Sequence, residues 1–147
     1  MKRVVLGVGN TIMGDEGVGV RCVEWLAPHL PPDVFVVDGG TSTHELLGDI
    51  EDAELLIIVD AIATTLPPGS IVRLEGDRIP SAFSNKLSPH QHGINDLLGA
   101  LALLGKSPKR LVLFGIAPER IALGMELTAA VSAVIPEVGR RVLAELA

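Results

Sequence analysis

Acidic side chains at the ends of hydrophobic runs are the first residues of this sequence that could do chemistry. Asp60 follows five apolar residues in the run LLIIVDA, residues 55–61. An ionised carboxylate at the end of a buried segment needs water, a hydrogen-bond donor or a cation beside it. It could equally cap the turn that follows, as aspartates often do. Asp60 is therefore either a turn cap or a site carboxylate.

A second acidic pair lies in the glycine-rich segment GVGNTIMGDEGVGV, residues 7–20. Asp15 and Glu16 stand where a helix should begin, and the helix dipole favours acidic residues there. One carboxylate is enough for that role. Because adjacent helical residues do not share a face, either of them can cap the helix while the other faces a cleft.

The same segment matches phosphate-binding loops poorly. It has neither the G-x-G-x-x-G fingerprint nor the Lys-Ser/Thr pair of a P-loop. A loop that presents backbone N–H groups to an anion would not place two carboxylates beside it. A nucleotide-binding function is therefore disfavoured, and tight backbone geometry with close packing explains the glycines better.

Two histidines occur in SPHQHG, residues 88–93, a stretch punctuated by Pro and Gly. Single histidines in loops are usually solvated or capping residues. Either His90 or His92 would nevertheless add an imidazole to the carboxylates of the preceding segments. Two carboxylates and one imidazole, with no thiolate, suit a borderline transition metal. Such a set leaves coordination positions open for water or substrate atoms.

Three other residues are weaker candidates. Cys22 falls on the apolar side of the first helix, which favours a small core thiol over a nucleophile. His29 lies at a Pro-flanked helix end and is expected to cap it. His44 is expected to be exposed or near the cleft rim. No G-x-S-x-G segment occurs, so a serine hydrolase of the nucleophile-elbow type is disfavoured.

Alternating strand and helix patterns must position these residues. The most apolar strand run, 55–61, is expected at the sheet centre, 71–75 at an edge, and 76–92 as a long polar loop that could help to dock a partner. This alternation predicts a three-layer α/β/α sandwich with a mostly parallel sheet, whose ligands bind beyond the carboxyl ends of the strands. Strands are expected at 3–8, 34–38, 55–61, 71–75 and 110–117, and helices at about 15–26, 94–104 and 128–146, with a short one after a cap at Ser42 or Thr43.

Composition and charge limit the class of protein. The 147 residues fit one domain, residues 1–147, and a hydrophobic share of 48% is enough for a packed core. The net charge of −6 disfavours nucleic acid and anionic membranes as partners, and no apolar run reaches the roughly 20 residues that span a bilayer. A single cysteine excludes an intramolecular disulfide framework, and the amino terminus lacks a signal-peptide pattern. We therefore expect a cytoplasmic protein, by default a monomer.

Five segments, in their order and spacing, resemble the hydrogenase maturation endopeptidases. The resemblance spans nearly the whole chain, and the combination is specific although each segment alone would be weak. The segments are GVGNTIMGDEGVG at the amino terminus, VVDGGT (36–41), IIVDA (57–61), SPHQHG (88–93) and LFGIAPERIALGMELT (113–128).

The resemblance implies an endopeptidase that removes a short carboxyl-terminal peptide from the precursor of a NiFe hydrogenase large subunit after nickel has been inserted. It implies a twisted, five-stranded sheet between helices. It also implies metal-contacting or catalytic roles for Glu16, Asp60 and His90, and so prefers His90 over His92. The nickel would be carried by the substrate precursor. Further matching positions are assigned to shaping the cleft and contacting substrate: Asn10, Asp38, Gly39 and Gly40.

Two mechanisms and two other functions stay open. The substrate's nickel could polarise a carbonyl or a water, or the carboxylates could act as general base and acid in an aspartic-type hydrolysis. A non-catalytic assembly chaperone would bind the precursor and leave its length unchanged. A small-molecule-binding α/β module would bind a ligand without any proteolysis.

Overall fold

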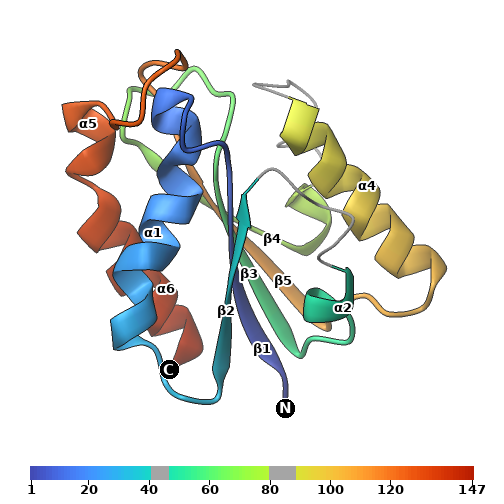
Figure 1. Ribbon diagram of the computed structural model, residues 1–147. Helices are drawn as coiled ribbons and strands as arrows, with labels where there is room; N and C mark the ends of the chain where they lie inside the picture. The colour runs from blue at the N-terminus through green and yellow to red at the C-terminus, as the bar shows by residue number, and fades with distance from the viewer. Residues whose placement is uncertain (41–46, 80–88) are drawn as a thin grey trace.

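A five-stranded sheet with strand order β2-β1-β3-β5-β4 forms the centre of the molecule (Figure 1). The computed structural model describes residues 1–40, 47–79 and 89–147, with the backbone alone at 77 and 89–94. Neighbouring strands are parallel except for β4, which runs antiparallel to β5 at the edge. The strands are β1 (Arg3–Val8), β2 (Val34–Gly40), β3 (Leu55–Ala61), β4 (Ile71–Glu75) and β5 (Arg110–Ile116).

Helices cover both faces of this sheet (Figure 1). On one face lie α1 (Val18–Leu26), α5 (Ala129–Ser132) and α6 (Ile135–Leu146). On the other lie α2 (Leu47–Ile50) and α4 (Pro89–Leu103). Three short 3-10 helices complete the described elements: η1 (Gly14–Gly17), η2 (Ala27–His29) and η4 (Gly76–Arg78). The predicted α/β sandwich with a mostly parallel, five-stranded sheet is therefore confirmed.

The core consists of two apolar clusters separated by the sheet. Successive side chains of a strand point to opposite faces, so each central strand contributes to both clusters. One cluster includes Val5, Ile57 and Val59 with Cys22 of α1 and Val142 of α6. The other includes Leu6, Leu56 and Ile58 with Ile50 of α2 and Leu101 of α4. Every residue of β3 is buried, which confirms its predicted place at the sheet centre.

Two predicted element boundaries are wrong. Helix α4 begins at Pro89, so both His90 and His92 lie in a helix and not in a loop. Proline is well tolerated in the first turn because the N–H it lacks has no partner there. The predicted loop 76–92 also contains η4, and its residues 80–88 lie outside the described part of the chain. The predicted last helix is divided into α5 and α6, with Pro136 in the first turn of α6, where a continuous helix would lose a hydrogen bond.

Three further predictions concern the edge strand, the segment after β2 and membrane-spanning helices. The edge position of β4 is confirmed by its antiparallel pairing with β5 and by its partly exposed side chains. The proposed cap at Ser42 or Thr43 and the rim position of His44 lie outside the described residues. Within the described ranges, no helix is both long and apolar enough to cross a membrane.

Candidate functional site

Glycines bring Glu16 to the carboxyl end of β1. Gly9 follows β1 with a φ of 140°, and a Cβ at this position would collide with the carbonyl oxygen of Glu16. Only a glycine therefore allows η1 to fold back against the end of the strand. Glu16 is 4% exposed in this position, so its carboxylate is almost fully withdrawn from bulk solvent.

Gly19 places the start of α1 on the same sheet edge. A Cβ at Gly19 would collide with the carbonyl oxygens of Val8 and Val59, which lie near the ends of β1 and β3. Asp60 is the next residue of β3 and is fully buried, and its Oδ1 accepts a hydrogen bond of 2.8 Å from the N–H of Ala61. The close packing thus brings two buried acidic residues, Glu16 and Asp60, to the carboxyl edge of the parallel strands.

His90 is the second residue of α4. Figure 1 shows the N-terminal end of α4 on the side of the sheet where the parallel strands end. The side chain of His90 lies outside the described part of the structure. Among the side chains that are described, no three His, Cys, Asp or Glu residues form a group that could hold a metal ion. The three-residue set with Glu16 and Asp60 therefore stays a prediction.

A polar cavity of about 240 Å³ lies at the ends of β1 and β2. Its walls are bound together by hydrogen bonds: the N–H of Gly9 donates to the carbonyl of Gly40 at 2.9 Å, and the N–H of Gly40 donates to Asp38 Oδ1 at 3.0 Å. Three of the four predicted substrate-contacting residues line it, whereas Gly39 is buried within β2. The lining residues are Gly9, Asn10, Thr11, Val20, Asp38 and Gly40.

Asp15 has a role that the sequence did not indicate. It is fully buried, yet it caps no helix. Its carboxylate accepts hydrogen bonds from the N–H groups of Glu119, Arg120 and Thr128 at 2.9, 3.0 and 2.7 Å, and from the Thr128 hydroxyl at 2.8 Å. These partners lie over a hundred residues away, so no local spacing could have revealed them.

The charged form of Asp15 is favoured despite its burial. Burial by itself raises the pKa of this carboxyl, but the hydrogen bonds from Thr128, Arg120 and Glu119 lower the pKa by more, and the net pKa lies below its ordinary value. Hydrogen bonds to a carboxylate are stronger than those between neutral groups. Asp15 therefore fastens the loop 119–128 beside η1, next to Glu16.

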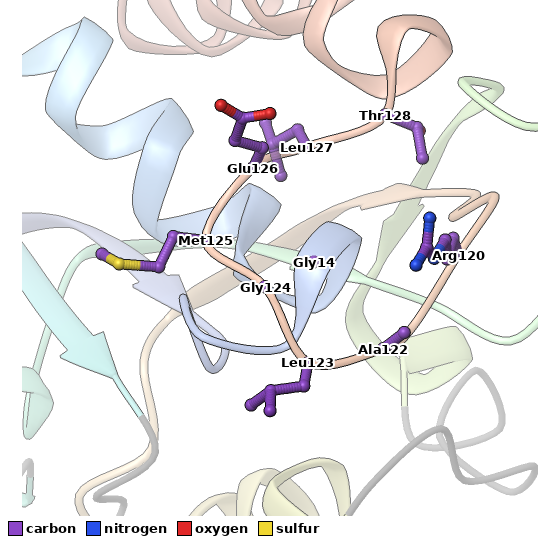
Figure 2. Close-up of a pocket in the computed structure, with 9 residues that line it drawn as sticks. All are labelled: Gly14, Arg120, Ala122, Leu123, Gly124, Met125, Glu126, Leu127 and Thr128. Atoms are coloured by element: carbon purple, nitrogen blue, oxygen red, sulfur yellow. The ribbon is translucent and has the colours of Figure 1, made fainter.

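That loop encloses a second cavity, of about 430 Å³ (Figure 2). Its backbone pairs with the segment after β1: the N–H of Gly14 donates to the carbonyl of Gly124 at 2.8 Å, and the N–H of Asp15 donates to the carbonyl of Arg120 at 3.1 Å. The lining residues are Gly14, Arg120, Ala122, Leu123, Gly124, Met125, Glu126, Leu127 and Thr128.

Two weaker candidates have structural roles, as predicted. Cys22 is buried in the core beneath α1, and burial raises the pKa of its thiol to about 12, so it stays protonated at neutral pH. His29 Nδ1 lies 2.9 Å from the carbonyl oxygen of Trp25, and the two rings stack with centroids 4.4 Å apart. His29 thus contacts a carbonyl near the end of α1, where a cap was expected.

The fold and the site together define a class of protein: an α/β sandwich with buried carboxylates at the carboxyl ends of its parallel strands, which is where ligands bind in such folds. Comparison with known proteins identifies the family within this class. A family model described as hydrogenase maturation protease matches residues 20–145. The hydrogenase 2 maturation protease of Escherichia coli strain K12 is 44% identical in an alignment 149 positions long, which covers 99% of this chain and 91% of that protein. The chain belongs to the hydrogenase maturation proteases.

Solved structures agree with this family. The hydrogenase maturating endopeptidase HybD of E. coli superimposes with a TM-score of 0.94 at 44% identity, over 99% of this chain and 92% of that one. The NiFe hydrogenase maturation protease HybD of Thermococcus kodakarensis gives a TM-score of 0.83 at 29% identity, over 100% and 99% of the two chains.

Several relatives are longer than this chain. The hydrogenase expression/formation protein HupD of Rhodobacter capsulatus is 42% identical over 118 residues, which cover 78% of this chain and 56% of that protein. The family predicted from five sequence segments is therefore confirmed, and with it the class of enzyme, an endopeptidase.

Proposed function

We propose that this chain removes the carboxyl-terminal peptide from the nickel-loaded precursor of a NiFe hydrogenase large subunit, and so completes maturation of that subunit. Glu16, Asp60 and His90 are the residues proposed at the cleavage site. The observation that carries the proposal is the burial of two carboxylates at the carboxyl edge of the sheet, the same edge at which a polar cavity lies at the ends of β1 and β2. Membership of the maturation proteases supports the type of reaction.

The polar cavity suits an extended peptide. Each peptide unit of a bound tail carries one N–H donor and one carbonyl acceptor that need partners. Asn10 Oδ1 accepts a hydrogen bond of 3.1 Å from the N–H of Ile12, and Asp38 Oδ1 accepts one from Gly40. The amide N–H groups of Asn10 and the second oxygen of Asp38 are the proposed donor and acceptor for the tail. Gly40 leaves room for its backbone, because the nearest atom to a Cβ there would be 3.9 Å away.

Hydrolysis adds water across the scissile peptide bond, and two routes fit these residues. In the first, the substrate's nickel meets Glu16, Asp60 and His90, and the nickel polarises the scissile carbonyl or the attacking water. In the second, one group acts as a carboxylate and takes a proton from water, while the other acts as a protonated carboxylic acid and donates its proton to the leaving amine. Burial strengthens either route, because charges interact more strongly in a medium of low dielectric constant.

Nickel borne by the substrate fits this donor set better than a resident ion. Two carboxylates and one imidazole form a weak, open site for nickel, whereas thiolates bind it firmly. Such a site can contact a metal without removing it from the thiolates of the precursor. Cleavage would then report that nickel has been inserted.

The proposed setting is the cytoplasm, and the proposed partner is the precursor, without nucleic acid or membrane. The net charge of −6 supports this, because an acidic surface does not attract polyanions. Cys22 is the single cysteine of the chain and is buried, so folding does not depend on an oxidising compartment. A monomer is proposed, and light scattering during size-exclusion chromatography tests this state.

The deciding experiment follows the intact mass of the precursor over time. Nickel-loaded and nickel-free precursors are each incubated with wild type, with Glu16→Gln and with Glu24→Gln as a matched control. Glu24 lies on the exposed side of α1 and pairs with Arg21 at 3.0 Å. Loss of a carboxyl-terminal peptide from nickel-loaded precursor alone, with wild type and Glu24→Gln but not Glu16→Gln, is the expected result. A precursor that binds wild type but keeps its mass would refute proteolysis and favour a chaperone.

A further inference from the structure

Three exposed apolar side chains adjoin the candidate site. Ile12, Leu123 and Met125 are 48%, 80% and 65% exposed. We call these three residues the apolar rim. In Figure 2 the side chains of Leu123 and Met125 extend away from the body of their loop. Contiguous exposed apolar groups on a folded protein are typical of surfaces that bind other proteins.

Backbone hydrogen bonds hold the apolar rim together across a long sequence separation. The N–H of Gly124, between the two loop members, donates to the carbonyl of Ile12 at 2.9 Å. Met13 and Gly124 form a parallel β-bridge, and the N–H of Gly14 donates back to Gly124 at 2.8 Å. The two segments that carry these three residues therefore lie side by side, although they are distant in the sequence.

Asp15 makes this surface an ordered one. Its four hydrogen bonds fasten both ends of the loop, at Glu119 and Arg120 on one side and at Thr128 on the other. The loop is thus held by polar contacts of its backbone and by Leu127, which packs against the core, whereas the side chains of Leu123 and Met125 stay in solvent. A surface that is already ordered loses little conformational entropy when a partner binds.

The apolar rim is continuous with the candidate site. Ile12 directly follows Asn10 and Thr11, which line the polar cavity. Glu16 directly follows Asp15, the residue that holds the loop in place. A protein whose tail enters the polar cavity would therefore extend over the apolar rim. A second copy of this chain seated there would lie over the entrance that the substrate needs.

We propose that the apolar rim docks an apolar surface on the folded body of the hydrogenase precursor, outside the peptide that is removed. This inference rests on the proposed function and deepens it. The polar cavity would bind the tail, and the apolar rim would supply the affinity for the body of the substrate. Docking would then position the cleavage site beside Glu16 and Asp60.

The test compares two double variants of matched chemistry. Leu123→Ser with Met125→Ser removes two side chains of the apolar rim. Leu103→Ser with Leu104→Ser removes two apolar side chains, 91% and 60% exposed, near the C-terminal end of α4, on the opposite side of the sheet (Figure 1). Initial rates of cleavage are measured against the concentration of nickel-loaded precursor. Both variants should keep the wild-type melting temperature, because every replaced side chain is exposed.

The rim variant should raise KM about tenfold with kcat unchanged, which corresponds to about 1.4 kcal/mol of lost binding. The control variant should keep both constants. Wild-type kinetics in the rim variant would overturn the docking proposal while leaving the proposed function intact. If wild type does not cleave the precursor at all, the proposed function fails. The dissociation constants for uncleaved precursor then decide the docking proposal, and equal constants for wild type and the rim variant would overturn it.

Discussion

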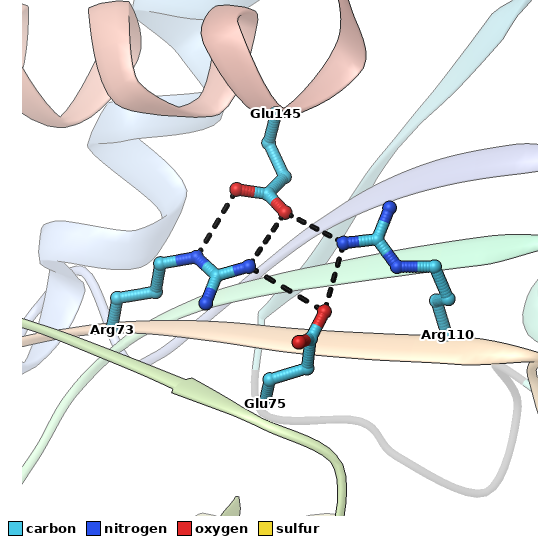
Figure 3. Close-up of polar contacts among 4 residues, drawn as sticks. All are labelled: Arg73, Glu75, Arg110 and Glu145. Carbon is cyan, nitrogen blue, oxygen red and sulfur yellow. Dashed lines mark hydrogen bonds and ion pairs between the residues drawn. The ribbon is translucent and has the colours of Figure 1, made fainter.

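The two ends of the sheet hold their acidic residues in opposite ways. At the carboxyl edge, Asp15, Glu16 and Asp60 are 0%, 4% and 0% exposed. At the opposite end of the sheet, where β5 begins, exposed Glu75 and half-buried Glu145 share a cluster with two arginines, Arg73 and Arg110 (Figure 3).

Charge pairing defines the exposed cluster. Arg73 binds both carboxylate oxygens of Glu145, at 3.1 and 2.7 Å, and Arg110 contacts Glu75 and Glu145 at 2.8 and 2.9 Å (Figure 3). The hydrogen bond from Arg73 lowers the pKa of Glu145, and the one from Arg110 lowers the pKa of Glu75. Solvent and salt screen such pairs, so each contributes little to stability.

At the carboxyl edge, the acidic side chains are buried. Uncharged donors satisfy Asp15, and the side chains of Glu16 and Asp60 are withdrawn from solvent. A buried carboxylate interacts more strongly with an arriving cation or proton than an exposed one does. We propose that the charges of the arginine-glutamate cluster serve local stability, whereas those at the carboxyl edge serve a ligand.

The largest expected effect is on the rate of cleavage, which should depend on the buried carboxylates and not on the exposed cluster. Asp60→Asn should slow cleavage of nickel-loaded precursor by at least about 100-fold, because it removes a metal ligand or a proton-transfer group. Glu75→Gln, the matched change in the exposed cluster, should leave the rate unchanged. The measurement is the rate of mass loss from the precursor. A wild-type rate in Asp60→Asn would contradict the proposed role of the carboxyl edge in cleavage.

The next largest effect is on stability, and it comes from the close packing of α1 against the ends of β1 and β3. Gly19→Ala should lower the free energy of unfolding by about 3 kcal/mol, because a methyl group would press on the carbonyls of Val8 and Val59. Gly99→Ala, in α4, has no atom within 4 Å of the new Cβ and should stabilise the protein by about 0.5–1 kcal/mol. Urea denaturation measures both. Equal effects of the two variants would show that the carboxyl edge is not tightly packed.

Asp15→Asn should reduce stability by about 1–3 kcal/mol, because the amide replaces one acceptor with a donor that faces other donors. The amides of Glu119, Arg120 and Thr128 should exchange with solvent faster, as measured by hydrogen exchange. Asp33→Asn is the matched control, because Asp33 is exposed and pairs with Arg3 at 2.9 Å. Unchanged exchange at the three amides would remove the assigned role of Asp15 in ordering the loop.

The smallest effect concerns pH at the exposed cluster. The hydrogen bond from Arg73 holds the pKa of Glu145 in the folded protein below its ordinary value. This pairing therefore stabilises the protein above the pKa of the unfolded chain, and the gain is lost as pH falls through the lower pKa of the folded protein. Glu145→Gln should cost about 0.5–1 kcal/mol at neutral pH and nothing in acid. Melting temperatures measured against pH test this. Parallel curves for wild type and variant would contradict the assignment.

Several features followed from the sequence because they depend on neighbouring residues. The short, continuous apolar runs at 3–8 and 55–61 were sufficient to predict strands, and Asp60 at the end of the second run marked the carboxyl edge. The start of α4 was missed because a Pro- and Gly-punctuated stretch resembles a loop. The division of the last helix was missed because its apolar pattern continues across the break near Pro136.

The residue types and their spacing determined which side chains gather where strands end, since parallel strands present their carboxyl ends at one edge. The sequence also determined the family, because five segments keep a specific order. Only the tertiary structure decided that Asp15 holds a loop 104 residues away, and that Ile12 lies beside Leu123 and Met125. Such contacts depend on how distant segments close over one another, and that closure leaves no periodicity or local spacing in the chain.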